Sequence, residues 1–311
     1  MKTGSLPGAA ARSAEQSGIG SERAPVGKLA LYQEVLGDGC VQCGLCPHQC
    51  LLKPGQVSRC LGRENKGGVL FVRNYAKVTS MALDPIEKKP LASFHPGTKI
   101  LSVGTFGCNL ACDFCQNWRI SQEEAPWREI SPEHLLRLAV EARRDGNLGV
   151  AYTYNEPTIW YEYVKDCARL IHDAGMLNVL VTNGFILESP LKALLPFIDA
   201  VNIDLKAITP DFYPDLCKGT LEPVLETIRN CHGQCHVELT TLLIPGLNDS
   251  EQDIITLSEW ISAISPDIPL HLSRHHPDFK MQEPAPISVQ RLRYLASIAS
   301  RSLREVHVGN A

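Results

Sequence analysis

Residues 107–118 read GCNLACDFCQNW and carry three cysteines spaced C-x3-C-x2-C, directly after the apolar segment Ile100–Gly104. A 4Fe–4S cluster has four irons, and a ferredoxin-type site gives each iron a thiolate. Three thiolates on one short loop, with no fourth cysteine close behind, would leave one iron open. An open coordination position distinguishes a catalytic metal from a structural one. The loop therefore predicts a catalytic cluster held by Cys108, Cys112 and Cys115.

A zinc knuckle or buried free thiols are the alternatives for this loop. Structural zinc takes four ligands, often in C-x2-C pairs, whereas this loop offers three. Leu110 and Phe114 lie between the cysteines and would shield a cluster from water, which tunes its reduction potential. The residue pattern favours the cluster.

From about residue 100 onward, short apolar runs alternate with amphipathic stretches. The runs predict six strands, at Lys99–Val103, Leu148–Tyr154, Asn178–Thr182, Ala200–Leu205, His236–Leu243 and Pro269–Leu272. Six helices are predicted at Pro132–Arg144, Ile159–Ala174, Ser189–Leu195, Glu222–Asn230, Ser250–Ile264 and Ser288–Ser302. This alternation is typical of a parallel sheet, either rolled toward a barrel or open. In both arrangements the functional site lies beyond the C-terminal ends of the strands.

Polar and ionisable residues follow these strands one after another. Asn155 and Glu156 come after the second strand, Asn183 after the third, and Asp204 and Lys206 at the end of the fourth. Polar loops after apolar strands are common, but they do not explain Asp204 and Lys206 within an otherwise apolar run. We therefore expect these side chains to meet the cysteine loop at one edge of the sheet.

A second group of cysteines precedes the predicted barrel. Cys43, Cys46, Cys50 and Cys60 offer four thiolates, which is enough to close a metal site completely, and Cys40 is a surplus member. Soft thiolates suit both zinc and a second iron–sulfur cluster, so the metal stays open. We assign residues 29–98 to a small Cys-rich module, residues 99–311 to the barrel and residues 1–28 to a disordered leader.

The composition of the 311-residue chain is that of a globular protein, with 44% hydrophobic and 21% charged residues. A net charge of −4 argues against a nucleic-acid partner. No apolar run reaches the roughly 18–20 residues that span a bilayer, and the first residues lack a hydrophobic signal core. Twelve cysteines without a secretion signal favour metal binding or redox chemistry over disulfide bonds. We expect a cytoplasmic protein with no membrane partner.

Several further motifs resemble those of the radical S-adenosylmethionine (SAM) superfamily. The subgroup that they resemble is the radical SAM enzyme of the AmmeMemoRadiSam system, which is related to the activating enzymes of pyruvate formate-lyase. The motifs are the cysteine loop itself, Tyr152–Thr158, Val181–Gly184, Asn202–Ala207, Pro269–Arg274, Val308–Asn310 and the N-terminal cysteines with Arg63 and Asn65. The resemblance covers roughly residues 40 to 310.

The resemblance implies a partial (β/α)6 barrel of the radical SAM type with a small Cys-rich N-terminal module. It implies that Cys108, Cys112 and Cys115 bind a 4Fe–4S cluster whose fourth iron carries SAM. Asn155 and Glu156 stand where the superfamily's glycine-rich motif contacts the SAM amino group, with asparagine where a glycine is usual. Asp204 and Lys206 stand where related enzymes hold the SAM ribose and carboxylate, and Asn183 is a further candidate contact.

The implied activity is the reductive cleavage of SAM to a 5′-deoxyadenosyl radical, which removes hydrogen from an unidentified substrate under anaerobic conditions. The electron would come from a donor such as ferredoxin or flavodoxin. Memo-like and AMMECR1-like proteins are partners suggested by the name of the system alone. Cys217, which lies just past a strand end, is a candidate hydrogen-atom donor.

Two other functions remain open from the sequence. The first is a glycyl-radical enzyme activase, as the relationship to pyruvate formate-lyase activation suggests. The second is an iron–sulfur electron carrier or metal-binding module without catalysis. An electron carrier or metal-binding module would not require Glu156, Asp204 and Lys206 at successive strand ends.

Overall fold

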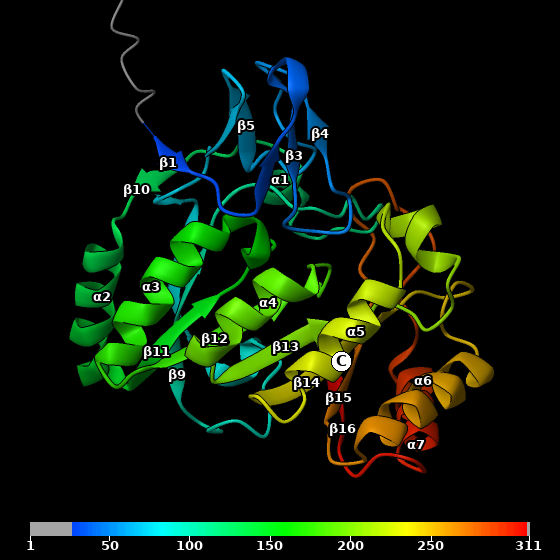
Figure 1. Ribbon diagram of the computed structural model, residues 1–311. Helices are drawn as coiled ribbons and strands as arrows, with labels where there is room; N and C mark the ends of the chain where they lie inside the picture. Colours follow the sequence, from blue (N-terminus) through cyan, green and yellow to red (C-terminus); the bar gives the residue numbers. More distant parts are fainter. Residues whose placement is uncertain (1–26, 310–311) are drawn as a thin grey trace, which may run out of the picture.

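All six predicted strands are present in the computed structural model, which describes residues 27–309 (Figure 1). The predicted leader lies outside the described residues except for its last two, and Lys28 begins a strand. The six strands are β9 (Lys99–Gly104), β11 (Asn147–Tyr152), β12 (Leu177–Thr182), β13 (Ala200–Asp204), β14 (His236–Leu243) and β15 (Leu270–Arg274). Each strand lies within two residues of its predicted bounds, because buried parallel strands are nearly continuous apolar runs.

The large sheet has eight strands in the described part of the chain, in the order β16-β15-β14-β13-β12-β11-β9-β8. Neighbours from β9 to β16 (Val306–Gly309) are parallel, whereas β8 (Ser80–Pro85) runs antiparallel to β9. The sequence pattern did not predict either edge strand with these bounds. Backbone pairing with β9 and β15 supplies their hydrogen bonds, so neither strand needs a strong sequence signal of its own.

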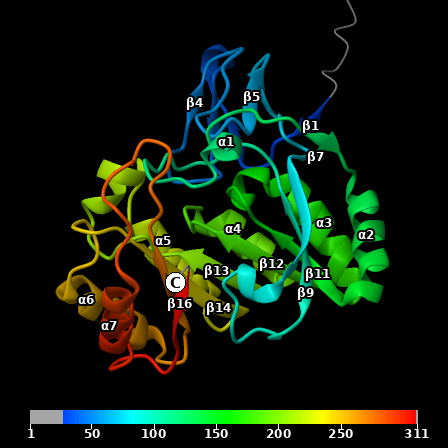
Figure 2. The same cartoon turned by 180° about the vertical axis from the view of Figure 1, so that it is seen from behind.

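The helices cover the outer face of this sheet, as the two opposite views show (Figures 1 and 2). They are α2 (Pro132–Glu141), α3 (Tyr161–Asp173), α4 (Glu188–Leu194), α5 (Glu222–Cys231), α6 (Glu251–Ile264) and α7 (Val289–Ala299), with the one-turn α1 (Trp118–Ser121) after the cysteine loop. Short helical turns are η1 (Gly37–Gly39), η2 (Ile86–Lys88), η3 (Ala142–Asp145), η4 (Pro157–Trp160), η5 (Leu195–Phe197) and the π-helix η6 (Tyr213–Cys217). Ser131, Ser250 and Ser288 cap α2, α6 and α7 by accepting a backbone N–H three residues on. No helix in residues 27–309 is long and apolar enough to cross a membrane.

The N-terminal segment forms small antiparallel sheets over one end of the barrel (Figures 1 and 2). Its strands are β1 (Lys28–Leu29), β2 (Gln33–Val35), β3 (Val41–Cys43), β4 (Leu51–Leu52), β5 (Arg63–Lys66), β6 (Val69–Val72) and β7 (Lys77–Val78), and β7 pairs with β10 (Arg128–Glu129). β8 then joins the large sheet, so the segment from residue 80 onward packs with the barrel. β8, which lies within the predicted N-terminal module, thus pairs with the first strand of the predicted barrel.

A buried ion pair connects the N-terminal sheets to the barrel helices. The Nη2 atom of Arg63 lies 2.8 Å from Oε1 of Glu162 on α3, and the two side chains are 0% and 1% exposed. The same carboxylate oxygen accepts the backbone N–H of Leu31 at 2.7 Å. Because both charges are removed from water, each depends on the other for compensation.

Residues 90–93 are hydrogen-bonded to strands of the large sheet. Glu238, buried on β14, accepts backbone N–H groups from Ala92 and Ser93 at 2.9 and 2.8 Å. It also bonds Nε2 of His236 at 2.9 Å and Nε2 of His271 at 2.6 Å. One carboxylate thus joins two strands to the crossing segment.

We expect Glu238 to stabilise the fold in a pH-dependent way. Burial alone would raise the pKa of this carboxyl, but hydrogen bonds from His236, His271 and the two backbone N–H groups lower it from 4.5 to about 2. A carboxyl whose pKa is lower in the folded state stabilises the protein at pH values above its pKa in the unfolded state. This stabilisation is lost as the pH falls from about 4.5 toward 2. Glu238→Gln should therefore lower the free energy of unfolding by about 1–3 kcal/mol at pH 7. Thermal unfolding at pH 7 and pH 3 measures the difference in stability between the wild type and Glu238→Gln. This difference should be smaller at pH 3, and an equal difference at both pH values would contradict the stabilising role of Glu238.

Candidate active site

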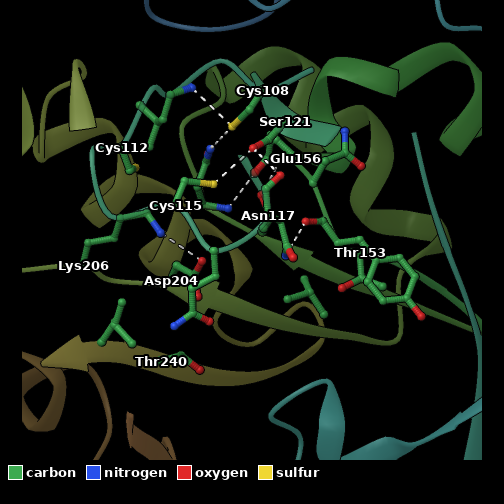
Figure 3. Close-up of a pocket in the computed structure, with 18 of the residues that line it drawn as sticks. Cys108, Cys112, Cys115, Asn117, Ser121, Thr153, Glu156, Asp204, Lys206 and Thr240 are labelled. Carbon is green, nitrogen blue, oxygen red and sulfur yellow. Dashed lines mark hydrogen bonds and ion pairs between the residues drawn. The ribbon is translucent and has the colours of Figure 1, made fainter. Parts of the chain in front are cut away.

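Cys108, Cys112 and Cys115 line one cavity of about 360 Å³ at the C-terminal end of the large sheet (Figure 3). The loop that bears them follows β9, and the cavity wall is completed by residues at the ends of β11, β12, β13, β14 and β15. These residues include Thr153, Tyr154, Asn155, Glu156, Thr182, Asn183, Asp204, Lys206, Thr240, Leu242 and Ser273. The structure thus brings the three cysteines together with every candidate SAM contact, as the strand-end rule predicts.

The cysteine loop is held in place by its backbone. Gly107 has φ +93°, and a Cβ atom there would lie 2.2 Å from the carbonyl oxygen of Cys60. Only glycine allows this approach of two backbones. Asn155 donates from Nδ2 to the Gly107 carbonyl at 2.8 Å and accepts the Thr105 N–H at 3.0 Å. The Asn155 amide, predicted as a SAM contact, is therefore engaged in positioning the loop.

Hydrogen-bonding groups inside and outside the C-x3-C-x2-C motif contact the sulfurs of Cys108 and Cys115. Asn183 Nδ2 lies 3.5 Å from the Cys108 sulfur, and the Leu110 N–H donates to the same atom at 3.4 Å. Ser121 Oγ lies 3.1 Å from the Cys115 sulfur. Hydrogen bonds to the sulfurs tune the potential of an iron–sulfur centre. Asn183 thus acts on a predicted cluster ligand, a role that the sequence did not suggest.

Cys112 has the Cys217 thiol as its partner. A hydrogen bond from Cys217 lowers the pKa of Cys112, burial opposes that shift, and the Lys206 ammonium adds to it. Cys217 is fully buried in η6 and is absent from the described residues that line the cavity. Its predicted role as a hydrogen-atom donor stays a prediction.

Glu156 is buried with both carboxylate oxygens engaged. One oxygen accepts from Thr182 Oγ1 at 2.7 Å and from the Thr158 N–H at 2.9 Å, and the other accepts the Asn183 N–H at 2.7 Å. Burial raises the pKa of this carboxyl, and these bonds offset part of the shift. Glu156 thus joins the end of β11 to the end of β12 while it faces the cavity. The oxygen that accepts only the Asn183 N–H keeps further acceptor capacity toward a ligand.

Asp204 and Lys206 form an ion pair on the cavity wall. Lys206 Nζ lies 3.0 Å from Asp204 Oδ2, and the two side chains are 15% and 37% exposed (Figure 3). Burial would lower the pKa of Lys206, but the Asp204 carboxylate and the nearby Cys112 raise it, so the ammonium stays charged. The pair offers a cation and a carboxylate side by side to a polar ligand.

Lys89 is a cavity residue that the sequence analysis missed. Its side chain is only 3% exposed, and Nζ donates to Asp84 Oδ2 at 2.8 Å. The Tyr154 hydroxyl donates to the same oxygen at 2.9 Å. Tyr154 could have been found, because it adjoins Asn155 in the chain. Lys89 carried no signal, because it follows the unpredicted strand β8 and reaches the cavity only through the fold.

No group of three or more Cys, His, Asp or Glu side chains in residues 27–309 is arranged to hold a single metal ion. The three cysteine side chains nevertheless face one cavity, with carboxylate and ammonium groups on its other wall (Figure 3). The residues present therefore fit a three-cysteine cluster with a polar ligand beside it.

Fold and site together define a radical SAM enzyme, and the chain belongs to the Radical SAM superfamily, whose family model matches residues 102–258. Within that superfamily it is related to the activating enzymes of pyruvate formate-lyase. The family implies a 4Fe–4S cluster and SAM as cofactors.

Two relatives and one solved structure illustrate the relationship. An uncharacterized protein of Methanocaldococcus jannaschii is 42% identical over 287 residues, which cover 90% of this chain and 84% of that protein. The pyruvate formate-lyase 1-activating enzyme of Escherichia coli K12 is 26% identical over 50% of this chain and 65% of that enzyme. A radical SAM methyltransferase from Sphaerobacter thermophilus shares the fold, with a TM-score of 0.54, 20% identity and coverage of 69% of this chain and 67% of that chain.

Proposed function

We propose that the protein holds a 4Fe–4S cluster on Cys108, Cys112 and Cys115 and cleaves SAM bound beside it. The observation that supports this most is the convergence of three thiols, Glu156 and the Asp204–Lys206 pair on one cavity. When bound, the cluster and SAM supply a one-electron reductive cleavage that produces a 5′-deoxyadenosyl radical able to remove hydrogen from a substrate. Every other contribution comes from the side chains and backbone around the cavity.

Different side chains around the cavity would contact different parts of SAM. The Lys206 ammonium would pair with the SAM carboxylate, and the Asp204 carboxylate would accept the ribose hydroxyls. Glu156 would offer the remaining lone pair of Oε2 to the SAM amino group. Asn183 donates from Nδ2 to the Cys108 sulfur at 3.5 Å and would steady this thiolate as a ligand of the cluster. Leu110, Phe114 and Leu242 contribute apolar surface to the same cavity.

Anaerobic reconstitution with iron and sulfide, followed by dithionite and SAM, tests this function. We expect 5′-deoxyadenosine and methionine to form in equal amounts, and chromatography measures both. An intact cluster that yields neither product would overturn the proposal and would favour the electron-carrier function.

We expect Lys206→Met to weaken SAM binding about tenfold, which corresponds to about 1.4 kcal/mol. The substitution keeps the aliphatic length but removes the ammonium that faces the cavity. Equilibrium binding of SAM to reconstituted protein measures the change, and the iron content must match that of the wild type. Lys192→Met, on the exposed face of α4, is the control and should bind SAM normally. An unchanged Kd at full iron content would remove Lys206 from the SAM site.

Activation of a glycyl-radical enzyme is the second candidate function, favoured by the similarity to the pyruvate formate-lyase 1-activating enzyme. Electron paramagnetic resonance would detect a backbone glycyl radical on a co-encoded protein after incubation with SAM and reductant. Product formation from SAM without such a radical on any glycyl-radical partner would count against it.

The partners are proposals of the same kind. A low-potential one-electron donor such as ferredoxin or flavodoxin would reduce the cluster. Membership of the AmmeMemoRadiSam system, with Memo-like and AMMECR1-like proteins, stays a prediction that co-purification from the native organism would test.

A further inference from the structure

Four cysteines of the N-terminal sheets come together away from the SAM cavity. Cys43 ends β3, Cys46 and Cys50 lie in the connection to β4, and Cys60 precedes β5. The Cys43 N–H donates to the Cys50 carbonyl at 3.0 Å, which closes the first three into one turn. Cys46 lies close enough to the other three for their charges to interact. Cys43, Cys46 and Cys60 are buried and Cys50 is half-buried, so this is a nearly enclosed group of thiols.

The backbone around these sulfurs is arranged to support thiolates. The N–H groups of Leu45, His48 and Gly62 each approach the sulfur two positions earlier and favour its ionised form. The backbone of Arg59 acts in the same sense on Cys50. Ser58 Oγ also lies 3.2 Å from the Cys60 sulfur. Hydrogen-bonding groups of the surrounding loops thus face these sulfurs.

A buried cation stands beside this group. The Arg63 side chain is 0% exposed, and its charge interacts with Cys43, Cys46 and Cys60. One of its nitrogens pairs with Glu162, but Nε has no hydrogen-bond partner among residues 27–309. An orphaned N–H on a fully buried guanidinium is costly unless an acceptor is supplied. Four thiolates on a metal centre would provide both the missing acceptor and the negative charge.

The two groups of cysteines share one property that bears on the choice between a cluster and a zinc ion. Among residues 27–309, neither group is arranged as the ligands of a single metal ion. Cys108, Cys112 and Cys115, which have this property, belong to a family whose cofactor is a cube. We propose that Cys43, Cys46, Cys50 and Cys60 bind a second iron–sulfur cluster, with one thiolate at each iron.

The loops that would hold the second cluster contact the loop that bears Cys108, Cys112 and Cys115. The Cys60 carbonyl packs against Gly107, the residue before Cys108, and His48 Nε2 bonds the Asn109 carbonyl at 2.8 Å. Four thiolates leave no iron open, so this centre would neither bind SAM nor touch a substrate. The assignment stands independently of SAM cleavage, and its test counts metal rather than turnover.

The experiment uses the full chain with Cys108, Cys112 and Cys115 all changed to alanine, produced and reconstituted under anaerobic conditions. We expect about four irons and four sulfides per chain in this triple variant and about eight of each in the wild type, because one cube contains four irons. Adding Cys46→Ser to the triple variant should remove the remaining iron. Adding Cys40→Ser, at the surplus cysteine of the same module, should leave it in place.

Mössbauer spectra of the wild type provide a measurement that needs no substitution, and should show two clusters in equal amounts. One zinc and no iron in the triple variant would overturn the cluster assignment. A triple variant without any metal, together with a single cluster in the wild type, would overturn the site itself. Failure of the wild type to cleave SAM would leave the iron count of the triple variant unchanged, so the two proposals fail separately.

Discussion

Cys112→Ala should reduce the formation of 5′-deoxyadenosine from SAM to the level of a reaction without protein. Cys112 is the central cysteine of the loop and interacts with the Cys217 thiol and the Lys206 ammonium. Its removal leaves two thiolates where a cluster with one open iron requires three. Chromatography of anaerobic reactions with dithionite measures the product, and iron analysis before the reaction records how much cluster is bound.

Cys167→Ala is the matched control for this substitution. Cys167 is buried in α3 within the hydrophobic core and does not line the cavity in the described chain. A small core cysteine contributes packing rather than metal ligation. The control should bind the same amount of iron as the wild type and form nearly as much product. Wild-type product from Cys112→Ala, or equal loss in both variants, would remove Cys112 from the cluster.

Glu162→Gln lowers the free energy of unfolding by about 3–5 kcal/mol, the usual cost of breaking a buried ion pair by removing one partner. The substitution preserves the shape of the side chain and an acceptor for the Leu31 N–H, but it leaves the Arg63 guanidinium buried without its counter-charge. The N-terminal sheets should therefore detach from α3 at lower denaturant concentration. Urea unfolding of the anaerobic protein, followed by circular dichroism, measures the change.

Glu188→Gln serves as the comparison for an exposed ion pair. Glu188 pairs with Lys192 on α4, and the two side chains are 60% and 61% exposed. Water compensates such charges when the partner is lost, so the expected change is about 1 kcal/mol or less. Equal effects of the two substitutions would show that the Arg63–Glu162 pair does not hold the N-terminal sheets to the barrel.

The barrel strands could be predicted from the sequence because their signal is local. The run His236–Leu243 is apolar enough to be placed at its observed bounds, and the serine caps locate the starts of α2, α6 and α7. β8 and β16 were not predicted because their stability comes from pairing with β9 and β15. An edge strand is stabilised by pairing with a neighbour that is distant in the sequence, so its own residues carry only part of the signal.

The residues of the candidate site also differ in how far the sequence could predict their positions. Because parallel strands end at one edge, the sequence could place Glu156, Asp204 and Lys206 with the cysteines. It could not show that Glu156 is engaged by Thr182 and Asn183, since those contacts depend on the register of β11 and β12. Nor could it place Lys89 in the cavity wall.

By itself, the sequence determined the ligand chemistry: three cysteines within eight residues remain together on one loop in any fold that contains it. It also determined the order of strands and helices, because apolar periodicity is set by near neighbours. Only the tertiary structure decided what surrounds those cysteines. The Cys217 partner, the Asn183 amide, Lys89 and the contact of Cys60 with Gly107 all come from segments distant in sequence. Their positions depend on how the whole sheet closes and on what the N-terminal sheets pack against, and no local pattern records either.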